Sequence, residues 1–450
     1  MTKVVTRIAP SPTGQMHIGT VRTALFNYLW AKKNSGTFIV RIEDTDVSRN
    51  RAEWTKMIFE DFEWCGLVPD KRYIQSEHLS RHRELLEKLV GEGKAYISKE
   101  PAKDDPSREV EVVRLKNLGK AVTFTDVIRG DVTFETNDLG DFVIARSLNA
   151  PLYHFAVVVD DIDAEVSHVI RGEDILSSTP RQILIQEALG FPRPVYVHLP
   201  LILGKNGKKL SKREHVVALE DYRKAGFLPE GIINYLALLG WNPGTDEEYF
   251  SLEELVERFS LEGLQKSGAI FDDVKLLSVN HRWMRKLSDD DFLSCLDVRR
   301  PTSDVGRQTS NILSKVVPLL KERARTFGEA RQVLSDEFGF FFAAPSPSRD
   351  VLLAKELSDR PGIAKSGLEA ALAAIGNLPD DVSAEVVRNT LMSLADAEEV
   401  RGKGGRGAVL WPLRYALSGQ EKSPDPFTII SILGREESLR RIKNAIAILG

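Results

Sequence analysis

The chain has 450 residues, of which 28% are charged and 42% hydrophobic, and its formal net charge is −4. This is an ordinary globular composition, long enough for several domains, and it excludes a uniformly basic surface for nucleic acid. An anionic partner would therefore need a local basic patch. The last fifty residues hold one in sequence, with nine Lys and Arg side chains against four Asp and Glu.

Cysteine content and hydropathy narrow the setting further. The two cysteines, Cys65 and Cys295, cannot build a disulfide framework or a cysteine-rich zinc site. A reducing cytoplasm is the simplest location for such a chain. No apolar run reaches membrane-spanning length, and the first ten residues lack the apolar core of a signal peptide. We therefore expect a cytoplasmic protein with no membrane partner.

The first sixth of the chain predicts a βαβ unit. Val4–Ala9 has the pattern of a strand, Val21–Lys33 carries a helical apolar stripe, and Thr37–Asp44 alternates like a second strand. A strand, a helix and a strand in about forty residues place the two strands parallel in one sheet.

A second βαβ unit follows more than a hundred residues later. Ser167–Asp174 and Val195–Leu203 are the predicted strands, and the helix between them starts at Thr179-Pro180 and ends at Gly190. The two units are expected to be halves of one doubly wound sheet. The predicted fold class is α/β, a Rossmann-type parallel sheet with a small α+β insertion, followed by all-α C-terminal domains.

Between the two units and after them the pattern changes. Ser98–Glu109 is charged and contains proline, and Thr123–Glu135 has the pattern of short strands around a turn, which together indicate an insertion domain. After Lys212 the chain is mostly helical, with turn-rich linkers at 300–310 and 343–350. The expected domains are 1–94 and 151–220 (the two halves of the sheet domain), 95–150 (a shortened α+β insertion), 221–300 (helical) and 301–450 (all-helical, divided near 345–350).

The loop after the first strand reads "RIAPSPTGQMHIGT" and is stiffened by Pro10 and Pro12. Gly19 allows backbone to approach a ligand, and the helix expected from about Thr20 offers free N–H groups to phosphate. His17 lies just before that helix, where its imidazole can donate a hydrogen bond to a phosphoryl oxygen. By itself the stretch fits a rigid turn with a surface histidine equally well.

A second loop, "GKNGKKLSKR" at residues 204–213, follows the last predicted strand and carries two glycines and five basic residues. Such a loop can close over a triphosphate and meet the negative charge that grows on a leaving pyrophosphate. Most lysine runs are solvated turns. The presence of both loops at one predicted crevice favours a nucleotide site.

These motifs together identify a family. "APSPTGQMHIGT" resembles the first signature of class I aminoacyl-tRNA synthetases in its glutamyl form, and "KLSKR" is similar to the second signature. Further resemblance to bacterial glutamyl-tRNA synthetases lies, in the expected order, in "FIVRIEDTD", "YIQSE", "YHFAVVVDD", "VIRGED", "TPRQ", "LPEGIINYLALLGW", "PLRYALSG" and "LGREESLRRI".

The resemblance implies a ligase that joins glutamate to ATP, with Mg²⁺, and passes glutamate from glutamyl-adenylate to the terminal adenosine of tRNA-Glu. Because the first step is attack of a carboxylate on the α-phosphate, catalysis should rest on placement and charge stabilisation. His17, Lys209 and Lys212 are the implied catalytic residues, and loss of Lys212 should cost roughly 3 kcal/mol. The implied ATP-binding residues are Pro10, His17, Gly19, Thr20, Asp174, Ile202, Lys209, Leu210, Ser211, Lys212 and Arg213.

The amino-acid site follows from the charges of glutamate, which brings two carboxylates and one ammonium group. The resemblance places Arg7, Ser11, Glu43, Tyr153 and Arg171 there. We assign Arg171 to the side-chain carboxylate by bidentate pairing, with Arg7 as the second candidate, and Glu43 to the ammonium. A buried arginine would reject glutamine, because an amide leaves its charge uncompensated. Without the resemblance, a plain Arg7–Glu43 salt bridge is the simpler interpretation.

Contacts with tRNA are implied for Asp46, Trp411 and Arg414, and Arg440 with Arg441 suggests a basic patch. Many relatives carry a zinc site in the insertion, but the corresponding "AYISKE" has no cysteine and the segment is short. We therefore expect no bound metal of the protein's own, in particular no zinc, and a trimmed acceptor-binding domain. A monomer is expected from the family.

Three other functions remain open. A non-catalytic tRNA-binding paralogue would be free to lose His17, Gly19, Lys209 and Lys212, which are all present. A glutaminyl-tRNA synthetase would have a β-barrel C-terminal part, where this chain has a helical pattern. A truncated relative that glutamylates a modified tRNA base would lack the residues beyond Arg300. Whether tRNA-Gln is a second substrate is also open.

Overall fold

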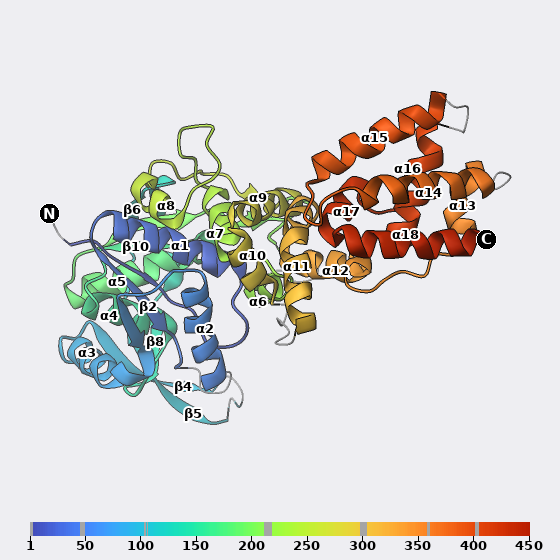
Figure 1. Ribbon diagram of the computed structural model, residues 1–450. Helices are drawn as coiled ribbons and strands as arrows, with labels where there is room; N and C mark the ends of the chain where they lie inside the picture. The colour runs from blue at the N-terminus through green and yellow to red at the C-terminus, as the bar shows by residue number, and fades with distance from the viewer. Residues whose placement is uncertain are drawn as a thin grey trace. The chain divides into compact units, whose positions relative to one another are not determined.

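The computed structural model describes residues 3–45, 50–102, 105, 107–210, 218–297, 304–357, 361–400 and 405–450. The chain divides into two compact units, 1–283 and 284–450, and each is described by itself (Figure 1). Both cysteines are free thiols: Cys65 is buried and Cys295 is exposed. Among the helices described, none combines the length and the apolar character needed to cross a membrane.

A parallel sheet organises the first unit, as the two βαβ patterns predict. The strands β1 (Val5–Ile8), β2 (Thr37–Ile42) and β3 (Lys71–Ile74) are parallel, and so are β10 (His168–Gly172) and β11 (Val195–Leu199). The backbone N–H of Ser167 donates to the Val5 carbonyl at 3.0 Å, so β10 lies beside β1. All six residues of β2 are buried, as expected for a strand covered on both faces.

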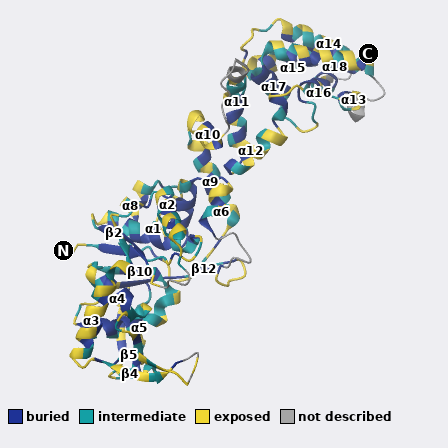
Figure 2. Ribbon diagram, turned by 90° about the horizontal axis from the view of Figure 1, so that it is seen from below, coloured by how far each residue is buried: buried dark blue, intermediate teal, exposed yellow. Residues whose placement is uncertain are grey.

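Helices cover the faces of this sheet, and α1 (Ile18–Lys33) makes the crossover from β1 to β2. Its buried residues lie almost all round the helix, because the sheet is on one side and α7 (Pro229–Leu238) and α8 (Leu252–Arg258) are on the other. Phe26 of α1 stacks on Phe259, with ring centroids 5.4 Å apart. Residues of α1 are largely buried in this core (Figure 2). The core fixes the N-terminus of α1 just after β1.

The segment between the two βαβ units contributes to two different sheets. The strands β4 (Ala95–Pro101), β5 (Glu109–Leu115), β8 (Phe142–Ser147) and β9 (Ala150–Pro151) form an antiparallel sheet. Its inner face packs on α3 (Leu79–Gly91), α4 (Tyr153–Asp163) and α5 (Thr179–Leu189) through one apolar cluster. The hairpin β6 (Val122–Asp126) and β7 (Gly130–Phe134) instead joins β11, where Asp126 is paired with Tyr196.

The remaining elements of the first unit include α2 (Ala52–Trp64), α6 (Leu219–Lys224) and α9 (Asp273–Lys286), in which the unit ends. The short strand β12 (Ile202–Leu203) pairs with β13 (Ala269–Ile270). The described residues of this unit also form three short 3₁₀ helices: η1 (Gln75–His78), η2 (Asn137–Leu139) and η3 (Glu173–Ser178).

The described residues of the second unit form helices joined by loops, as the helical pattern after Lys212 predicts. Its helices are α10 (Asp289–Leu296), α11 (Asp304–Arg323), α12 (Phe327–Asp336), α13 (Arg349–Leu357), α14 (Pro361–Gly376), α15 (Ala384–Val400), α16 (Gly405–Ser418), α17 (Pro426–Leu433) and α18 (Arg435–Leu449), with the 3₁₀ helix η4 (Gly339–Phe341). The predicted fold class is confirmed. Its physical basis is the spacing of apolar residues, which changes from the short apolar and alternating runs of strands in the first unit to the 3.6-residue period of helices in the second.

Candidate active site

A cavity of about 430 Å³ lies at the carboxyl ends of β1 and β10, where strand order in the sheet reverses direction. Every described residue that the sequence assigns to ATP or glutamate lines it: Arg7, Pro10, Ser11, His17, Gly19, Thr20, Glu43, Tyr153, Arg171, Asp174, Ile202, Lys209 and Leu210. Ser211, Lys212, Arg213 and Asp46 lie outside the described residues.

One side of the cavity is the N-terminus of α1, which begins at Ile18 with His17 as its N-cap. The His17 Nδ1 atom accepts a hydrogen bond from the Gly19 N–H at 2.9 Å. A ring nitrogen that accepts carries no proton, so the proton of the neutral imidazole is on Nε2. A Cβ added at Gly19 would lie 3.1 Å from Nδ1, so a side chain there would require the imidazole to move by a few tenths of an ångström.

The loop with the basic residues begins as a tight hairpin. The Leu210 N–H donates to the Ile202 carbonyl at 2.9 Å, and Gly207 takes a positive φ of 74° at the turn. Lys209 reaches back to η3, where its Nζ lies 2.9 Å from Asp174 Oδ2. Both side chains are about half exposed, at 59% and 47%, so water screens the pair and a phosphate can replace the carboxylate at little cost.

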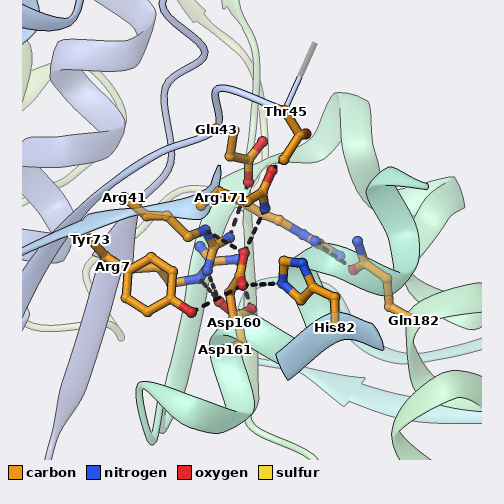
Figure 3. A network of polar contacts seen from close by, with 11 residues as sticks. Arg7, Arg41, Glu43, Thr45, Tyr73, His82, Asp160, Asp161, Arg171 and Gln182 are labelled. Atoms are coloured by element: carbon orange, nitrogen blue, oxygen red, sulfur yellow. Dashed lines mark hydrogen bonds and ion pairs between the residues drawn. The ribbon is translucent and has the colours of Figure 1, made fainter. Parts of the chain in front are cut away.

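A buried ionic network underlies the opposite side of the cavity (Figure 3). Arg7 makes two hydrogen bonds to Asp161, at 3.0 and 3.2 Å. Arg41 contacts Asp161 at 2.5 Å and Glu43 at 3.1 Å. The simpler Arg7–Glu43 salt bridge is therefore replaced by pairing through Asp161 of α4. Burial alone raises the pKa of Asp161, but Arg7 and Arg41 hold it below its ordinary value.

The neighbouring carboxylate, Asp160, is fully buried and extends the network to residues of β3, η1 and α3. It accepts hydrogen bonds from Tyr73 at 3.1 Å and Gln75 at 2.5 Å, and its Oδ1 lies 2.6 Å from His82 Nε2. Glu43 keeps one carboxylate edge toward the cavity, and burial raises its pKa. A cationic ammonium group is the natural partner for a carboxylate held in such a place.

Arg171 differs in its partners from Arg7 and Arg41, which both pair with Asp161. Its guanidinium donates to Gln182 Oε1 at 2.7 Å, to Thr179 Oγ1 at 2.8 Å and to His198 Nε2 at 3.1 Å. All three acceptors are neutral, and the ion pairs of the described residues include none at Arg171, which is 5% exposed. Burial, and then the nearby Arg7, lower its pKa. A buried cation of this kind lacks an anion.

Several residues of the site are absent from the sequence-based prediction. Arg41 and Arg22 also line the cavity, and Arg22 donates to the carbonyls of Pro200 and Leu239 while burial lowers its pKa to about 10. The sequence does contain a signal for buried ionic contacts of this kind: charged residues stand inside apolar runs, as in "FIVRIED" and "AVVVDD". A charged side chain on a buried element needs a hydrogen-bonding partner.

In the second unit, Trp411 on α16 is 44% exposed, with the Arg414 guanidinium 5.7 Å from its ring centroid. Arg414 also donates to the Glu421 carbonyl at 3.0 Å. The predicted patch of Arg440 and Arg441 is wrong in its second member. Arg441 is 4% exposed and donates to the Leu417 carbonyl of α16, because its side chain points about 100° round α18 from that of the exposed Arg440.

Comparison with known families agrees with this fold and cavity. A model described as "tRNA synthetases class I (E and Q), catalytic domain" matches residues 3–104 and 99–278, and one described as "Anticodon binding domain" matches residues 289–446. The parallel sheet, the cavity at its switch point and these two matches are those of a class I aminoacyl-tRNA synthetase.

Individual relatives narrow the family. The glutamate–tRNA ligase of Geobacter sulfurreducens is 37% identical over 100% of both chains, and that of Carboxydothermus hydrogenoformans is 37% identical over 97% of this chain and 98% of its own. A crystal structure of a glutamate tRNA ligase from Elizabethkingia meningosepticum, in complex with its amino acid, has a TM-score of 0.87 at 31% identity and covers 100% of both chains. The chain belongs to the glutamate–tRNA ligase family.

Proposed function

We propose that this enzyme activates L-glutamate with ATP and transfers it to the 3′-terminal adenosine of tRNA-Glu. The observation that carries the amino-acid assignment is Arg171, a buried guanidinium on the cavity wall whose described partners are all neutral. The side-chain carboxylate of glutamate supplies the anion that this cation lacks. Glutamine would leave the charge buried and uncompensated, so it is rejected.

The other polar groups of the cavity orient the rest of the amino acid. Burial raises the pKa of Glu43, and the cationic ammonium group of the substrate stabilises its charged form by donating hydrogen bonds to the carboxylate. Arg7, held rigidly by Asp161, together with Ser11 and Tyr153, lies beside the α-carboxylate that must reach the nucleotide. Placement of this carboxylate accounts for much of the rate, since two bound reactants no longer have to find each other.

In the first step a carboxylate oxygen attacks the α-phosphorus of ATP, and pyrophosphate leaves with the electrons of the broken P–O bond. The Nε2–H of His17, whose tautomer the Gly19 N–H selects, donates to a phosphoryl oxygen as negative charge develops. Lys209 exchanges Asp174 for the leaving phosphates, and Lys212 acts beside it. Pro10, Gly19, Thr20, Ile202, Leu210, Ser211 and Arg213 complete the ATP site.

Magnesium fits this site as a partner of the nucleotide. The described residues contain no group of three His, Cys, Asp or Glu side chains arranged to hold a metal. Mg²⁺ usually keeps few protein ligands and binds substrate phosphates. We propose that Mg²⁺ arrives on the ATP phosphates, where it supplies charge neutralisation, and that no zinc is bound. Metal analysis of the purified protein tests the second statement.

In the second step a ribose hydroxyl of the terminal adenosine attacks the acyl carbon of glutamyl-adenylate, and AMP leaves. We propose that the insertion at 95–150 contacts the acceptor end, that 221–300 contacts the stem, and that 301–450 reads the anticodon. Exposed Trp411 and Arg414 on α16 favour stacking and backbone contacts there, and Asp46 is a further tRNA contact. The protein is proposed to be a cytoplasmic monomer.

Glutamate-dependent ATP–pyrophosphate exchange in the presence of tRNA tests the proposal. We expect exchange with glutamate and none with glutamine for the wild type, and a glutamate KM raised at least about a hundredfold in Arg171→Gln. Arg193→Gln removes an exposed arginine that pairs with Glu187, and it should behave as wild type. Absence of exchange would instead favour a non-catalytic tRNA-binding protein.

Whether tRNA-Gln is a second substrate is decided by a parallel charging experiment. Purified tRNA-Glu and tRNA-Gln are each incubated with labelled glutamate, ATP and enzyme. Charging of tRNA-Glu alone would make the enzyme discriminating, and charging of both would make it non-discriminating.

A further inference from the structure

Behind Arg171, on the side away from the cavity, lies a buried Asp126–His198 pair. His198 is on β11 and Asp126 ends β6, and both side chains are fully buried. Asp126 Oδ2 lies 2.7 Å from His198 Nδ1 and also accepts the His198 backbone N–H at 2.9 Å. Its other oxygen, Oδ1, accepts the N–H groups of Ile128 and Arg129, both at 3.0 Å. The carboxylate is thus held in one orientation.

The hydrogen bonds around His198 determine which nitrogen carries the proton. Asp126 only accepts, so Nδ1 must donate to it. On the other side, Arg171 Nε can only donate, and it lies 3.1 Å from His198 Nε2. Thr179 Oγ1 accepts from Arg171 at 2.8 Å and lies 3.1 Å from the same Nε2, so its own proton points there. Nε2 therefore carries no proton, its single lone pair is shared by these two donors, and the ring is neutral.

We propose that Asp126 and His198 are positioning residues for glutamate recognition: Asp126 fixes the imidazole tautomer whose Nε2 lone pair holds the Arg171 guanidinium toward the substrate carboxylate. The inference rests on the role of Arg171 proposed above and assigns the residues that make that role possible. Neither side chain touches the cavity, so both act through Arg171. The arrangement follows a general rule, in which the far nitrogen of a functional imidazole is oriented by a carboxylate.

Protonation of His198 would reverse this arrangement. A second proton on Nε2 removes the acceptor that Arg171 Nε has among the described residues and sets two cations side by side. Burial first of all lowers the pKa of His198, with Asp126 opposing and Arg171 and Arg129 reinforcing that direction. These are the charged groups that face the ring from β6, β10 and the hairpin turn, and Tyr196 of β11 stacks beside it. The ring therefore stays neutral at neutral pH.

Two substitutions of His198 separate the acceptor from the rest of the ring. His198→Asn keeps a donor at the position of Nδ1 for Asp126 but leaves Arg171 Nε without an acceptor. His198→Gln extends an amide oxygen to the position of Nε2 and restores that acceptor. Tyr196→Phe, on the same strand as His198, removes the hydrogen bond from the Tyr196 hydroxyl to Gln186 of α5 and is the matched control for local packing. Thermal unfolding of all three establishes that the proteins are folded.

The readout is the KM for glutamate in tRNA-dependent pyrophosphate exchange, measured from pH 5.5 to 8 with saturating ATP. We expect His198→Asn to raise the glutamate KM roughly tenfold, with the ATP KM unchanged, and His198→Gln to recover most of the loss. Because burial lowers the pKa of His198, the glutamate KM of the wild type should rise only at pH values below the ordinary histidine pKa of about 6.5, and this rise should be absent in His198→Gln.

Different failures have different meanings. If the wild type exchanges no pyrophosphate with glutamate, the proposed function fails. Two results with an active wild type would overturn the positioning role of His198 while the function stands. The first is a wild-type glutamate KM in His198→Asn. The second is a glutamate KM that rises at low pH in His198→Gln as it does in the wild type. If His198→Asn does not fold, the pH profile of His198→Gln decides the question by itself.

Discussion

Arg7 on β1 and Asp161 on α4 are joined by two hydrogen bonds, at 3.0 and 3.2 Å, although 154 residues separate them in sequence. Asp161 also accepts from Arg41 of β2, so one carboxylate of α4 holds the two neighbouring strands of the sheet at the cavity. The pairing keeps Arg7 rigid and in part neutralised. Arg171, by contrast, has neutral side-chain acceptors and no ion pair among the described residues.

Removal of the Asp161 charge is expected to destabilise the fold. Asp161→Asn leaves Arg7 and Arg41 buried without a full counter-charge, which should lower the free energy of unfolding by about 3–5 kcal/mol. Asp163→Asn is the matched control, because its ion pair with Arg81 is partly exposed and should be worth less than about 1 kcal/mol. Urea unfolding at pH 7 measures both, and equal stability of the two variants would contradict the prediction.

The same carboxylate makes a defined contribution to the pH dependence of stability. The pKa of Asp161 is lower in the folded protein than in the unfolded chain, so the unfolded chain binds the proton more readily. The stability advantage of wild type over Asp161→Asn should be constant above about pH 4, the ordinary aspartate range. It should be lost as the pH falls further through the folded pKa. An advantage already shrinking at pH 6 would mean that burial outweighs the two arginines.

His17 has two separable roles, as helix cap and as phosphate donor. His17→Asn keeps an N-capping acceptor but cannot reach a phosphate, whereas His17→Ala loses both functions. We expect the alanine variant to lose about 1 kcal/mol of stability and the asparagine variant almost none. Both should reduce the kcat of pyrophosphate exchange about a hundredfold or more. A fully active His17→Asn enzyme would assign His17 to capping alone.

Lys209 is expected to matter for catalysis and little for stability. Its ion pair with Asp174 is half exposed, so Lys209→Ala should change the unfolding free energy by less than about 1 kcal/mol. The kcat of exchange should fall about a hundredfold, because a charge near the leaving pyrophosphate is lost. Lys208→Ala, one position earlier in the same exposed hairpin, should retain activity within about twofold and serves as the control. Equal losses in the two variants would indicate only a general effect of loop charge.

Trp411 is expected to contribute to tRNA affinity and not to the binding of ATP or glutamate. Its indole is 44% exposed, which leaves a face for a base to stack on. Trp411→Ala should raise the tRNA KM for aminoacylation about tenfold, with the KM for ATP and glutamate unchanged. Val386→Ala removes an exposed apolar side chain of α15 and should have no effect. An unchanged tRNA KM in Trp411→Ala would exclude stacking at this position.

The amino-acid sequence by itself determined the local parts of this protein. The loop from Arg7 to Thr20, the parallel strands around it and the helical second unit follow from spacing, prolines, glycines and hydrophobic period, which act over a few residues. The structure starts α1 at Ile18, two residues before the expected Thr20, because the backbone N–H of Gly19 is already capped by the side chain of His17.

Only the tertiary structure decided the partners of the buried charges. Asp161 with Arg7, and Asp126 with His198, are contacts across 154 and 72 residues, and no local pattern distinguishes them from other acids near other bases. The same limit applied to Arg441, whose exposure depended on the helix packed against it. Burial makes an unpaired charge costly, and folding therefore selects the partner that distance and orientation allow, which is a property of the packed chain as a whole.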